Sequence, residues 1–425
     1  MQYRSWKYVI LAALLCLLTG LTAACEKGAD DAAVDVGEVV IPALFLVNPE
    51  TGVADNKDLV EDFNKAYAGR YRIEVEWMTE TVEGYRARLK QLNAQDKLPA
   101  LITDVGMDED FYRLLVDNDR LVDLSAYMDA EWTAMINEDV LADCTETDGA
   151  IYMSPIVSPV YSFAGIIYNR QMLAQAGYAV FPEDWDGFFA CLEALRENWV
   201  TPLALHGGGT YWSPMVLATA YCGRNGAGAR FLDQQFPQDY DTAAMEDLLY
   251  CLDKIYDYTY PDALAVDYAT AQTRFYNGSA AMLINGYWVL ETMDERQQSQ
   301  FGFAPFPGNV MVVSPKMTAW AATTGYSEDV TRGVVELLRY RVVCSKENSE
   351  AFMASEGTPI EQDYKTAVRN VRRMIPNYQL KWEQAIQNEF FNEYMPAFIN
   401  DEMTADEFIR RLNEAAQKIH QEKTG

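Results

Sequence analysis

Four tryptophans lie near the ends of expected helices and strands rather than inside apolar runs. They are Trp212, Trp288, Trp320 and Trp382. A flat ring in such a position can stack on the C–H face of a sugar while neighbouring polar groups bind its hydroxyls. The alternative is core packing, which a chain with 12% aromatic residues also allows.

Polar side chains that follow expected strands are the second group of candidates. Asn48 follows the first strand, Glu80 the second, and Asp108 and Glu109 the third. In open α/β sheets, ligands bind at the carboxyl ends of the strands. A carboxylate there can accept two hydroxyl bonds, and charge-assisted bonds are strong. The alternative is that these acids are solvated in loops or lie at helix N-termini, where the dipole favours negative charge.

The sequence offers little for nucleophilic or metal catalysis. Only two histidines, His206 and His420, are present, and they are far apart. A metal site or a Ser-His-Asp triad therefore has few parts, and no nucleophile elbow, zinc-protease or phosphate-loop motif occurs. The run His206-Gly207-Gly208-Gly209 matches an esterase oxyanion-hole motif, but without the elbow it is interpreted as a loop. Glycoside hydrolases use a pair of carboxylates, but among 63 Asp and Glu such pairs are inevitable. Their presence is therefore no evidence for this activity. We expect no catalytic residue, cofactor or metal.

The elements that position these residues alternate between strand and helix. Apolar periodicity predicts strands at 43–47, 71–77 and 101–105, with helices over 56–68 and from Thr81 between them. This β-α-β repetition predicts a sheet that is at least partly parallel. A second series begins near residue 157, with strands at 164–168, 203–205, 280–284 and 301–304, and helices at 185–198, 243–258, 331–343, 348–355, 380–392 and 404–420.

The first 25 residues have the three parts of a secretory signal. Arg4 and Lys7 are basic, 8–18 is apolar or aromatic, and small residues precede Cys25. The terminal Cys makes the segment resemble a bacterial lipoprotein signal, which implies cleavage before Cys25 and a lipid on its thiol. The alternative is a permanent membrane helix, for which the run is short.

Composition and length describe a soluble protein of two lobes on a tether. Residues 26–38 are rich in Gly, Ala and Asp and are typical of a flexible leash. A chain of 425 residues is too long for one core. Its net charge of −29 argues against a nucleic-acid partner. Five cysteines remain beyond the lipid site, odd in number and without a C-x-x-C pair, which argues against a disulfide framework: Cys144, Cys191, Cys222, Cys251 and Cys344.

Several ordered motifs resemble those of extracellular solute-binding proteins, family 1, the receptors of carbohydrate ABC importers. Residues 275–288 read F-Y-N-G-S-A-A-M-L-I-N-G-Y-W, similar to the family's F-x-x-G-x-A-A-M-x-x-x-G-x-W. Residues 148–155 match D-G-x-x-Y-x-x-P and are followed by Tyr168-Asn169-Arg170, like Y-N-[KR]. Weaker similarities follow at Gly177, Trp185, Thr201-Pro202, 303–308 and 357–360.

This resemblance implies an α/β fold of two lobes, each a largely parallel sheet flanked by helices, with the ligand in the cleft between them. The first lobe would comprise 39–154 plus 308–345, and the second 157–305 plus 350–425. The chain would cross at Ser154 to Val157 and again near Pro305 to Pro307. Closure of the lobes would capture a sugar or oligosaccharide for delivery to a membrane permease.

The resemblance also implies ligand contacts. Trp288 matches the stacking tryptophan of the signature, and Trp382 falls roughly at a later one. Trp320 lies where the returning segment faces the cleft, although Thr318-Ala319-Trp320-Ala321 replaces a Gly-rich loop. The remaining aromatic candidates are Tyr287, Trp212, Tyr211 and Tyr161.

We therefore expect a monomeric, lipid-anchored binding protein on the outer face of the cell membrane, and not an enzyme. Its partners would be a carbohydrate, the transmembrane subunits of an ABC permease and, through the lipid, the membrane. Two alternatives stay open. One is a receptor of the same fold for a polyamine or peptide, and the other is a lipid-anchored carbohydrate-processing enzyme.

Overall fold

A computed structural model describes residues 37–47, 54–156, 163–208 and 211–424. The expected signal, Cys25 and the tether up to residue 36 lie outside these residues, as do Asn48 and Tyr161. Glu38–Gly425 forms one compact unit that contains every described helix and strand. Within the described part of the chain, no helix combines the length and apolarity needed to cross a bilayer.

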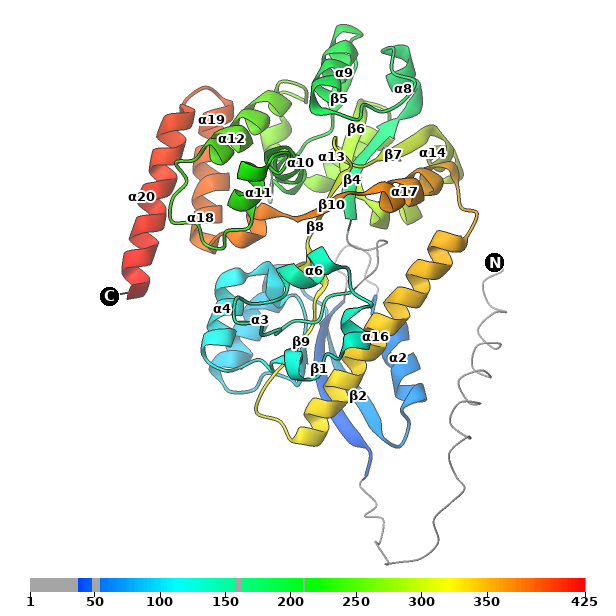
Figure 1. Ribbon diagram of the computed structural model, residues 1–425, viewed down its shortest axis with the longest axis vertical. Coiled ribbons are helices and arrows are strands. Elements are labelled where there is room, and N and C mark those ends of the chain that lie inside the picture. Colours follow the sequence, from blue (N-terminus) through cyan, green and yellow to red (C-terminus); the bar gives the residue numbers. More distant parts are fainter. Residues whose placement is uncertain (1–36, 48–53, 157–162, 209–210, 425) are drawn as a thin grey trace, which may run out of the picture. The chain divides into compact units, whose positions relative to one another are not determined.

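The first lobe is built on a four-stranded sheet in the order β2-β1-β3-β9 (Figure 1). β1 is parallel to both β2 and β3, and β9 closes the sheet antiparallel to β3. The strands are β1 (Val39–Leu46), β2 (Tyr71–Met78), β3 (Leu101–Ile102) and β9 (Ala321–Ala322). The predicted β-α-β succession thus forms a parallel sheet with one returning strand.

Helices cover both faces of this sheet, because alternate residues of β1 point to opposite sides. Ile41, Ala43 and Phe45 pack into one core with α2 and α16, whereas Leu44 packs into another with α3 and α4. The helices of this lobe are α2 (Lys57–Ala66), α3 (Val82–Ala94), η1 (Val105–Met107), α4 (Glu109–Asp117), η2 (Leu124–Ala126), α5 (Ala130–Thr133), α6 (Glu138–Asp143) and the first part of α16 (Glu328–Ala354).

The second lobe is built on a six-stranded sheet in which all strands but one run the same way. The path is β10-β8-β4-β6-β5, and β7 also pairs with β4. β4 is antiparallel to β6, β7 and β8. The strands are β4 (Phe163–Asn169), β5 (Thr201–Leu203), β6 (Ala280–Gly286), β7 (Phe301–Ala304), β8 (Val310–Val313) and β10 (Arg373–Pro376).

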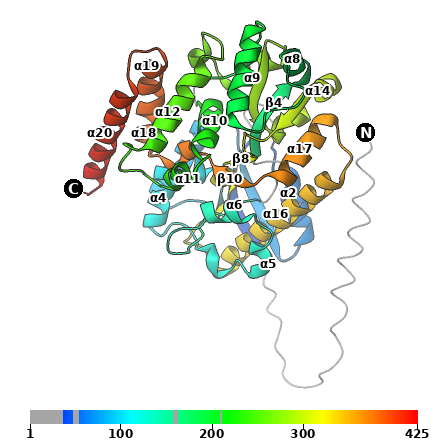
Figure 2. The ribbon, with the colours of Figure 1, turned by 45° about the horizontal axis from the view of Figure 1, so that its top comes forward.

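The helices of the second lobe bury the largest core of the molecule. α18, η6 and α19 follow one another without a break, and α20 lies beside them in both views (Figures 1 and 2). All four pack into the core that α10 and α12 also share. The helices are α8 (Arg170–Gln175), α9 (Trp185–Glu197), α10 (Trp212–Cys222), α11 (Gly226–Leu232), α12 (Ala243–Tyr256), η3 (Ala263–Ala265), α13 (Tyr268–Tyr276), η4 (Tyr287–Thr292), α14 (Glu295–Gln300), α17 (Pro359–Asn370), η5 (Tyr378–Lys381), α18 (Gln384–Glu389), η6 (Phe390–Tyr394), α19 (Met395–Ile399) and α20 (Ala405–Thr424).

The return of the chain to the first lobe differs from the prediction. β8 pairs with β4 and β10 in the second sheet, so the predicted boundary at residue 308 is too early. The chain returns after Val313, through α15 (Pro315–Thr318) and into β9. The apolar run 310–313 reads as a strand in either lobe, and only its pairing decides which.

The two helices predicted over 331–343 and 348–355 are one continuous helix, α16, of 27 residues. No Gly or Pro separates the two predicted parts, so the backbone has no cause to break. Leu337 packs in a core of the first lobe, and Phe352 packs against a core of the second. This helix therefore connects the two cores directly.

Candidate functional site

The register of the second sheet sets one row of residues at its carboxyl edge. Gly286 at the end of β6 pairs with Ala164, and Val313 at the end of β8 pairs with Phe163. Pro376, the last residue of β10, pairs with Val313. The residues that follow these ends therefore emerge along one edge, where open α/β sheets bind ligands.

An aromatic cluster occupies the β6 end of this edge. The ring of Trp288 lies on Gly286, where a Cβ would come within 2.1 Å of the indole. Trp288 meets Trp212 edge to face, with centroids 5.8 Å apart, and Trp212 meets Tyr268 at 6.3 Å. Both indoles are partly exposed. The glycine of the signature thus holds the ring of Trp288 against the sheet.

His206 adds polar atoms to this cluster. Its ring meets Tyr268 at 5.6 Å, and its Nε2 accepts a 3.3 Å hydrogen bond from the backbone N–H of Ser213. Burial lowers the pKa of His206 to about 4, so the ring is neutral at physiological pH. Its Nδ1 and the Ser213 hydroxyl are buried, and neither has a hydrogen-bond partner among the described residues. Both residues are only 1% exposed, so the partly exposed rings are the part of the cluster that a ligand can reach.

The backbone that presents Trp212 is strained. Tyr211, the residue before α10, has φ of 48°, in the left-handed region that non-glycine residues rarely adopt. The ring of Tyr211 stacks on Phe391 at 5.2 Å and 14°, and the residue is buried. Such strain persists where the surroundings fix it, and it clusters at functional sites. Tyr211 thus anchors the turn, whereas Trp212 faces the cluster.

Two other predicted aromatic contacts lie inside cores of the second lobe. The ring of Tyr287 packs against Phe352 and Tyr364, with centroids 4.5 and 5.2 Å away. Trp382 has no exposed surface and packs between rings that include Tyr378 and Phe390. Neither ring can reach a ligand in this arrangement.

Trp320 lies at the carboxyl edge of the first sheet. Its ring packs on Phe45 at 4.9 Å, and the guanidinium of Arg341 lies 4.0 Å from its centroid. Arg341 donates to the carbonyls of Ser154 and Thr318, which join both crossings of the chain. With 3% of its surface exposed, Trp320 fixes these crossings and leaves little area for stacking.

The predicted acidic contacts are engaged within the protein or exposed. Asp108 caps α4 by accepting from the N–H of Phe111 and pairs with Lys90 at 2.6 Å. Glu109 pairs with Arg113 at 2.8 Å and with Lys316 at 3.4 Å. Burial raises the pKa of Glu109, although the neighbouring Lys316 and Arg113 lower it in part. Glu80 is exposed at the start of the α3 turn.

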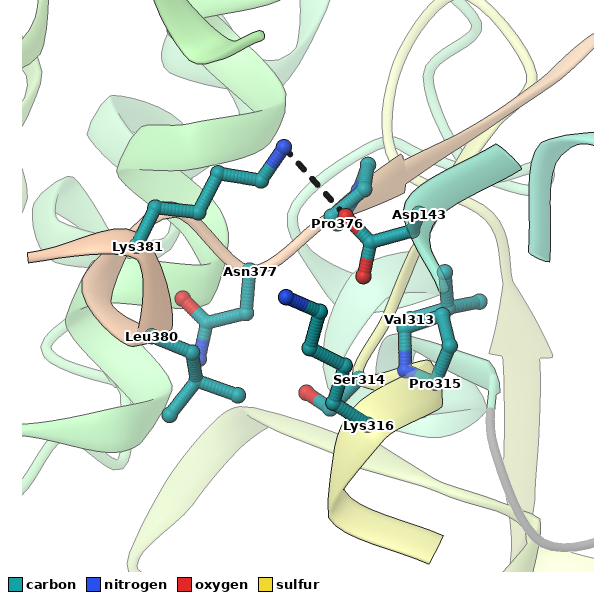
Figure 3. Close-up of a pocket in the computed structure, with 9 residues that line it drawn as sticks. All are labelled: Asp143, Val313, Ser314, Pro315, Lys316, Pro376, Asn377, Leu380 and Lys381. Carbon is teal, nitrogen blue, oxygen red and sulfur yellow. Dashed lines mark ion pairs between the residues drawn. The ribbon is translucent and has the colours of Figure 1, made fainter. Parts of the chain in front are cut away.

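A small polar pocket lies at the β8 and β10 end of the same edge as Trp288 (Figure 3). Ser314 follows β8, Asn377 follows β10, and Asp143 comes from α6 of the first lobe. The ammonium groups of Lys316 and Lys381 point into the pocket, and Lys381 pairs with Asp143 at 3.3 Å. The pocket therefore combines side chains of both lobes.

A larger hollow than this pocket lies elsewhere. It measures ≈ 510 Å³ and lies along α20, with α12 opposite. Acidic and amide side chains line most of it, among them Glu246, Asp406 and Asn413, and no aromatic ring does. It thus lacks the flat apolar surface that a sugar ring needs.

Sequence reasoning missed part of the cluster and the whole pocket. Tyr268 is the first residue of α13, and an aromatic residue in the first turn of a helix does not by itself indicate a binding site. His206 was interpreted as a loop residue, although it directly follows a predicted strand. Lys316, Asn377 and Lys381 follow β8 and β10, and neither of these strands was predicted, so the open-sheet rule could not be applied to them. No group of three metal-ligating side chains occurs in the part of the chain that the structure describes.

Solved structures share this fold across nearly their full length. A chitin oligosaccharide binding protein matches with a TM-score of 0.69 and 18% identity, covering 90% of this chain and 98% of that one. A Streptococcus pneumoniae solute-binding protein in complex with the blood group A-trisaccharide gives 0.70 and 18%, covering 89% and 100%. A family 1 extracellular solute-binding protein from Bifidobacterium longum subsp. infantis gives 0.67 and 16%, covering 90% and 100%. The chain therefore has the two-lobed fold of these proteins.

A search of curated protein sequences gave no match to this chain. The family model described as "Bacterial extracellular solute-binding protein" matches residues 58–367, well over half of the chain. Members of this family bind solutes outside the cytoplasm. The chain belongs to the family of bacterial extracellular solute-binding proteins.

Proposed function

We propose that this protein captures a saccharide outside the cell and delivers it, unchanged, to an ABC permease. The observation that carries the proposal is the cluster at the end of β6, where Trp212 and Trp288 meet at 5.8 Å beside His206. Flat, partly exposed rings such as these can stack on the C–H faces of a sugar.

Similar structures support a sugar as the solute. They include a chitin oligosaccharide binding protein and solute-binding proteins in complex with the blood group A-trisaccharide and with raffinose. Two of the predicted acidic contacts point the same way. Asp108 and Glu109 are held by Lys90, Arg113 and Lys316, so they form no open carboxylate surface for a polyamine.

Capture follows from the division of the fold into two lobes. A ligand on the aromatic cluster contacts the second lobe, and closure adds contacts from the first. The ligand makes all of its contacts only when both lobes touch it. It therefore binds the closed form more tightly and shifts the population toward that form. No bond needs to change in this cycle, and the proposal is a receptor and not an enzyme.

Titration calorimetry of residues 38–425 tests the proposal. The panel contains glucose, galactose, N-acetylglucosamine, their di- and trisaccharides, and spermidine. Micromolar or tighter binding of a saccharide that is recovered intact is the expected result. Heat from spermidine alone would overturn the sugar, and an altered saccharide would make the protein an enzyme.

We further propose that the protein is a monomer held to the membrane by a lipid on Cys25. The apolar run and small residues before this cysteine support the lipid. Expression of the full chain should give a membrane-bound protein whose first residue is an acylated Cys25. Cys25→Ser should release it or leave the signal uncut, and an unmodified Cys25 in the membrane fraction would contradict the proposal. Light scattering of residues 38–425 should give one chain per particle.

A further inference from the structure

The two glycines after His206 bind the segment that leads into α13. The backbone N–H groups of Gly207 and Gly208 both donate to the carbonyl of Val266, at 3.2 and 2.8 Å. A Cβ on Gly207 would lie 2.7 Å from the Cα of Leu264. Neither glycine has a positive φ. Glycine is therefore needed at Gly207 because two backbones approach closely, and not because of an unusual backbone angle.

This segment places Tyr268 beside the aromatic cluster. Asp267 is the N-cap of α13 and accepts a 2.8 Å hydrogen bond from the backbone N–H of Thr270, so the helix begins at Tyr268. The ring of Tyr268 meets that of His206 at 5.6 Å and 89°, and that of Trp212 at 6.3 Å and 77°. Rings of two other segments thus hold it in place.

A buried amide holds the hydroxyl of Tyr268. Asn285, on β6, has no exposed surface, and its Nδ2 donates a 2.7 Å hydrogen bond to the hydroxyl oxygen of Tyr268. Its Oδ1 accepts a 2.9 Å hydrogen bond from the backbone N–H of Gly286. Both ends of the amide are used, so its bonds fix its orientation. The ring of Tyr268 is therefore preorganised, and a ligand that contacts it does not have to order it.

Tyr268 is partly exposed, as are Trp212 and Trp288. The three rings follow one another, with Trp212 in contact with both of the others. We propose that Tyr268 is a further ligand-contacting ring, which packs on the C–H groups of the saccharide beside Trp212. Gly207 and Asn285 are positioning residues that act through it. This inference rests on the proposed function and extends its site to a residue and to the loop that places it.

The test is titration calorimetry of variants of residues 38–425 with glucose, galactose, N-acetylglucosamine and their di- and trisaccharides. Tyr268→Ala removes the ring, Tyr268→Phe removes only its hydroxyl, and Asn285→Ala removes the amide that holds the hydroxyl. The matched control is Tyr276→Phe. Tyr276 lies on the same helix, and its hydroxyl accepts a 2.8 Å hydrogen bond from the amide of Gln272.

Tyr268→Ala should weaken binding of the tightest saccharide by about tenfold or more. Tyr268→Phe and Asn285→Ala should each weaken it about three- to fivefold. The double variant should lose no more than the weaker-binding single variant, because both changes break the same hydrogen bond. Tyr276→Phe should change the affinity by less than about twofold. Additive losses would overturn the positioning role of Asn285.

Gly207→Ala tests the loop. The added Cβ collides with the backbone of Leu264, so the segment before Tyr268 must shift, and the affinity should fall about as far as in Asn285→Ala. The control is Gly226→Ala, whose Cβ would meet only the guanidinium of Arg230, at 3.7 Å. Urea unfolding of each variant separates a loss of binding from a loss of folding. An unchanged affinity in a folded Gly207→Ala would overturn the role of the loop.

Contact between ring and ligand is measured by NMR on deuterated protein in which only the tyrosine rings carry protons. We expect a nuclear Overhauser effect from the bound saccharide to one tyrosine ring, and Tyr268→Phe should abolish it. This measurement decides the question even if Tyr268→Ala does not fold. Absence of that effect, or an unchanged affinity of folded Tyr268→Ala, would overturn this inference while the proposed function stands. If the unsubstituted protein binds no saccharide, the proposed function fails and this inference fails with it.

Discussion

The indole of Trp288 meets that of Trp212 at 66°, with the two centroids 5.8 Å apart. Trp212 opens α10, and Trp288 follows β6, so the contact joins a helix to a strand end. Neither ring can move without disturbing the other. Their effects on ligand binding should therefore be coupled.

Replacing either tryptophan by alanine should weaken saccharide binding at least tenfold, about 1.4 kcal/mol. The double variant should lose less than the sum of the single losses, because each ring supports the other. Calorimetry of the four proteins measures this difference. Trp199→Ala is the control, since Trp199 is 97% exposed and outside the cluster. Additive losses would contradict the coupling, and an unchanged affinity for Trp288→Ala would remove Trp288 from the site.

His206 should make the protein less stable in acid. Burial lowers its pKa from 6.5 to about 4, so between these values the unfolded state binds a proton that the native state does not. Stability is then highest above pH 6.5 and falls as the pH is lowered towards 4, by about 3 kcal/mol in all. Urea unfolding at several pH values should show this slope, and His206→Gln should flatten it. An identical slope in the variant would contradict the assignment.

Arg341 is 8% exposed and donates a hydrogen bond to the carbonyl of Thr318. Arg341→Met leaves this carbonyl without its donor, so we expect it to destabilise the native state by about 2 kcal/mol. No carboxylate of the described residues pairs with Arg341, and burial lowers its pKa to about 9. Urea unfolding measures the loss. Arg332→Met on the same helix is the control, since its exposed pair with Glu328 contributes about 0.3–0.5 kcal/mol. Equal losses would show that Arg341 is not structural.

Of the five thiols, we expect one to react slowly with a thiol reagent in the native protein and four not to react. Cys344 is half-buried, whereas Cys144, Cys191, Cys222 and Cys251 are buried, and all five are free. Burial raises the pKa of the Cys251 thiol, which keeps it protonated and unreactive. Ellman's reagent should label at most one thiol of native residues 38–425, and Cys344→Ser should abolish that reaction. Labelling of a second native thiol would place it at the surface.

The fold could be predicted from the sequence where the local apolar pattern along the chain agrees with the way in which the strands pair. The β-α-β succession of the first lobe is periodic along the chain, and the signature around β6 fixed a strand, its glycine and the following tryptophan. The resemblance placed residues from 308 onward in the first lobe, whereas β8 pairs with β4 and β10 in the second sheet. All four residues of β8 are apolar and buried. The local sequence of such a strand does not indicate which strands it pairs with. Only its long-range pairing shows which sheet it belongs to.

The site was predictable only in part, for the same reason. Trp382 lies between Lys381 and Glu383, a setting typical of an exposed loop. Its ring is nevertheless covered by Tyr240 and Phe390, which come from other segments. Conversely, Asn377 gave no signal, because a single amide after a strand is common. What encloses a side chain depends on tertiary contacts that a local pattern does not contain.

The return of the chain into β9 sets an order for folding during synthesis. Domains generally fold as units, the N-terminal one first. Here, however, Leu101 pairs with Ala322, and the first core also needs Val342. A nascent chain that ends after β7 has made most of the second sheet but leaves the first without its closing strand and one covering helix. Both lobes must therefore mature together late in translation, and contacts of such sequence separation make folding slow.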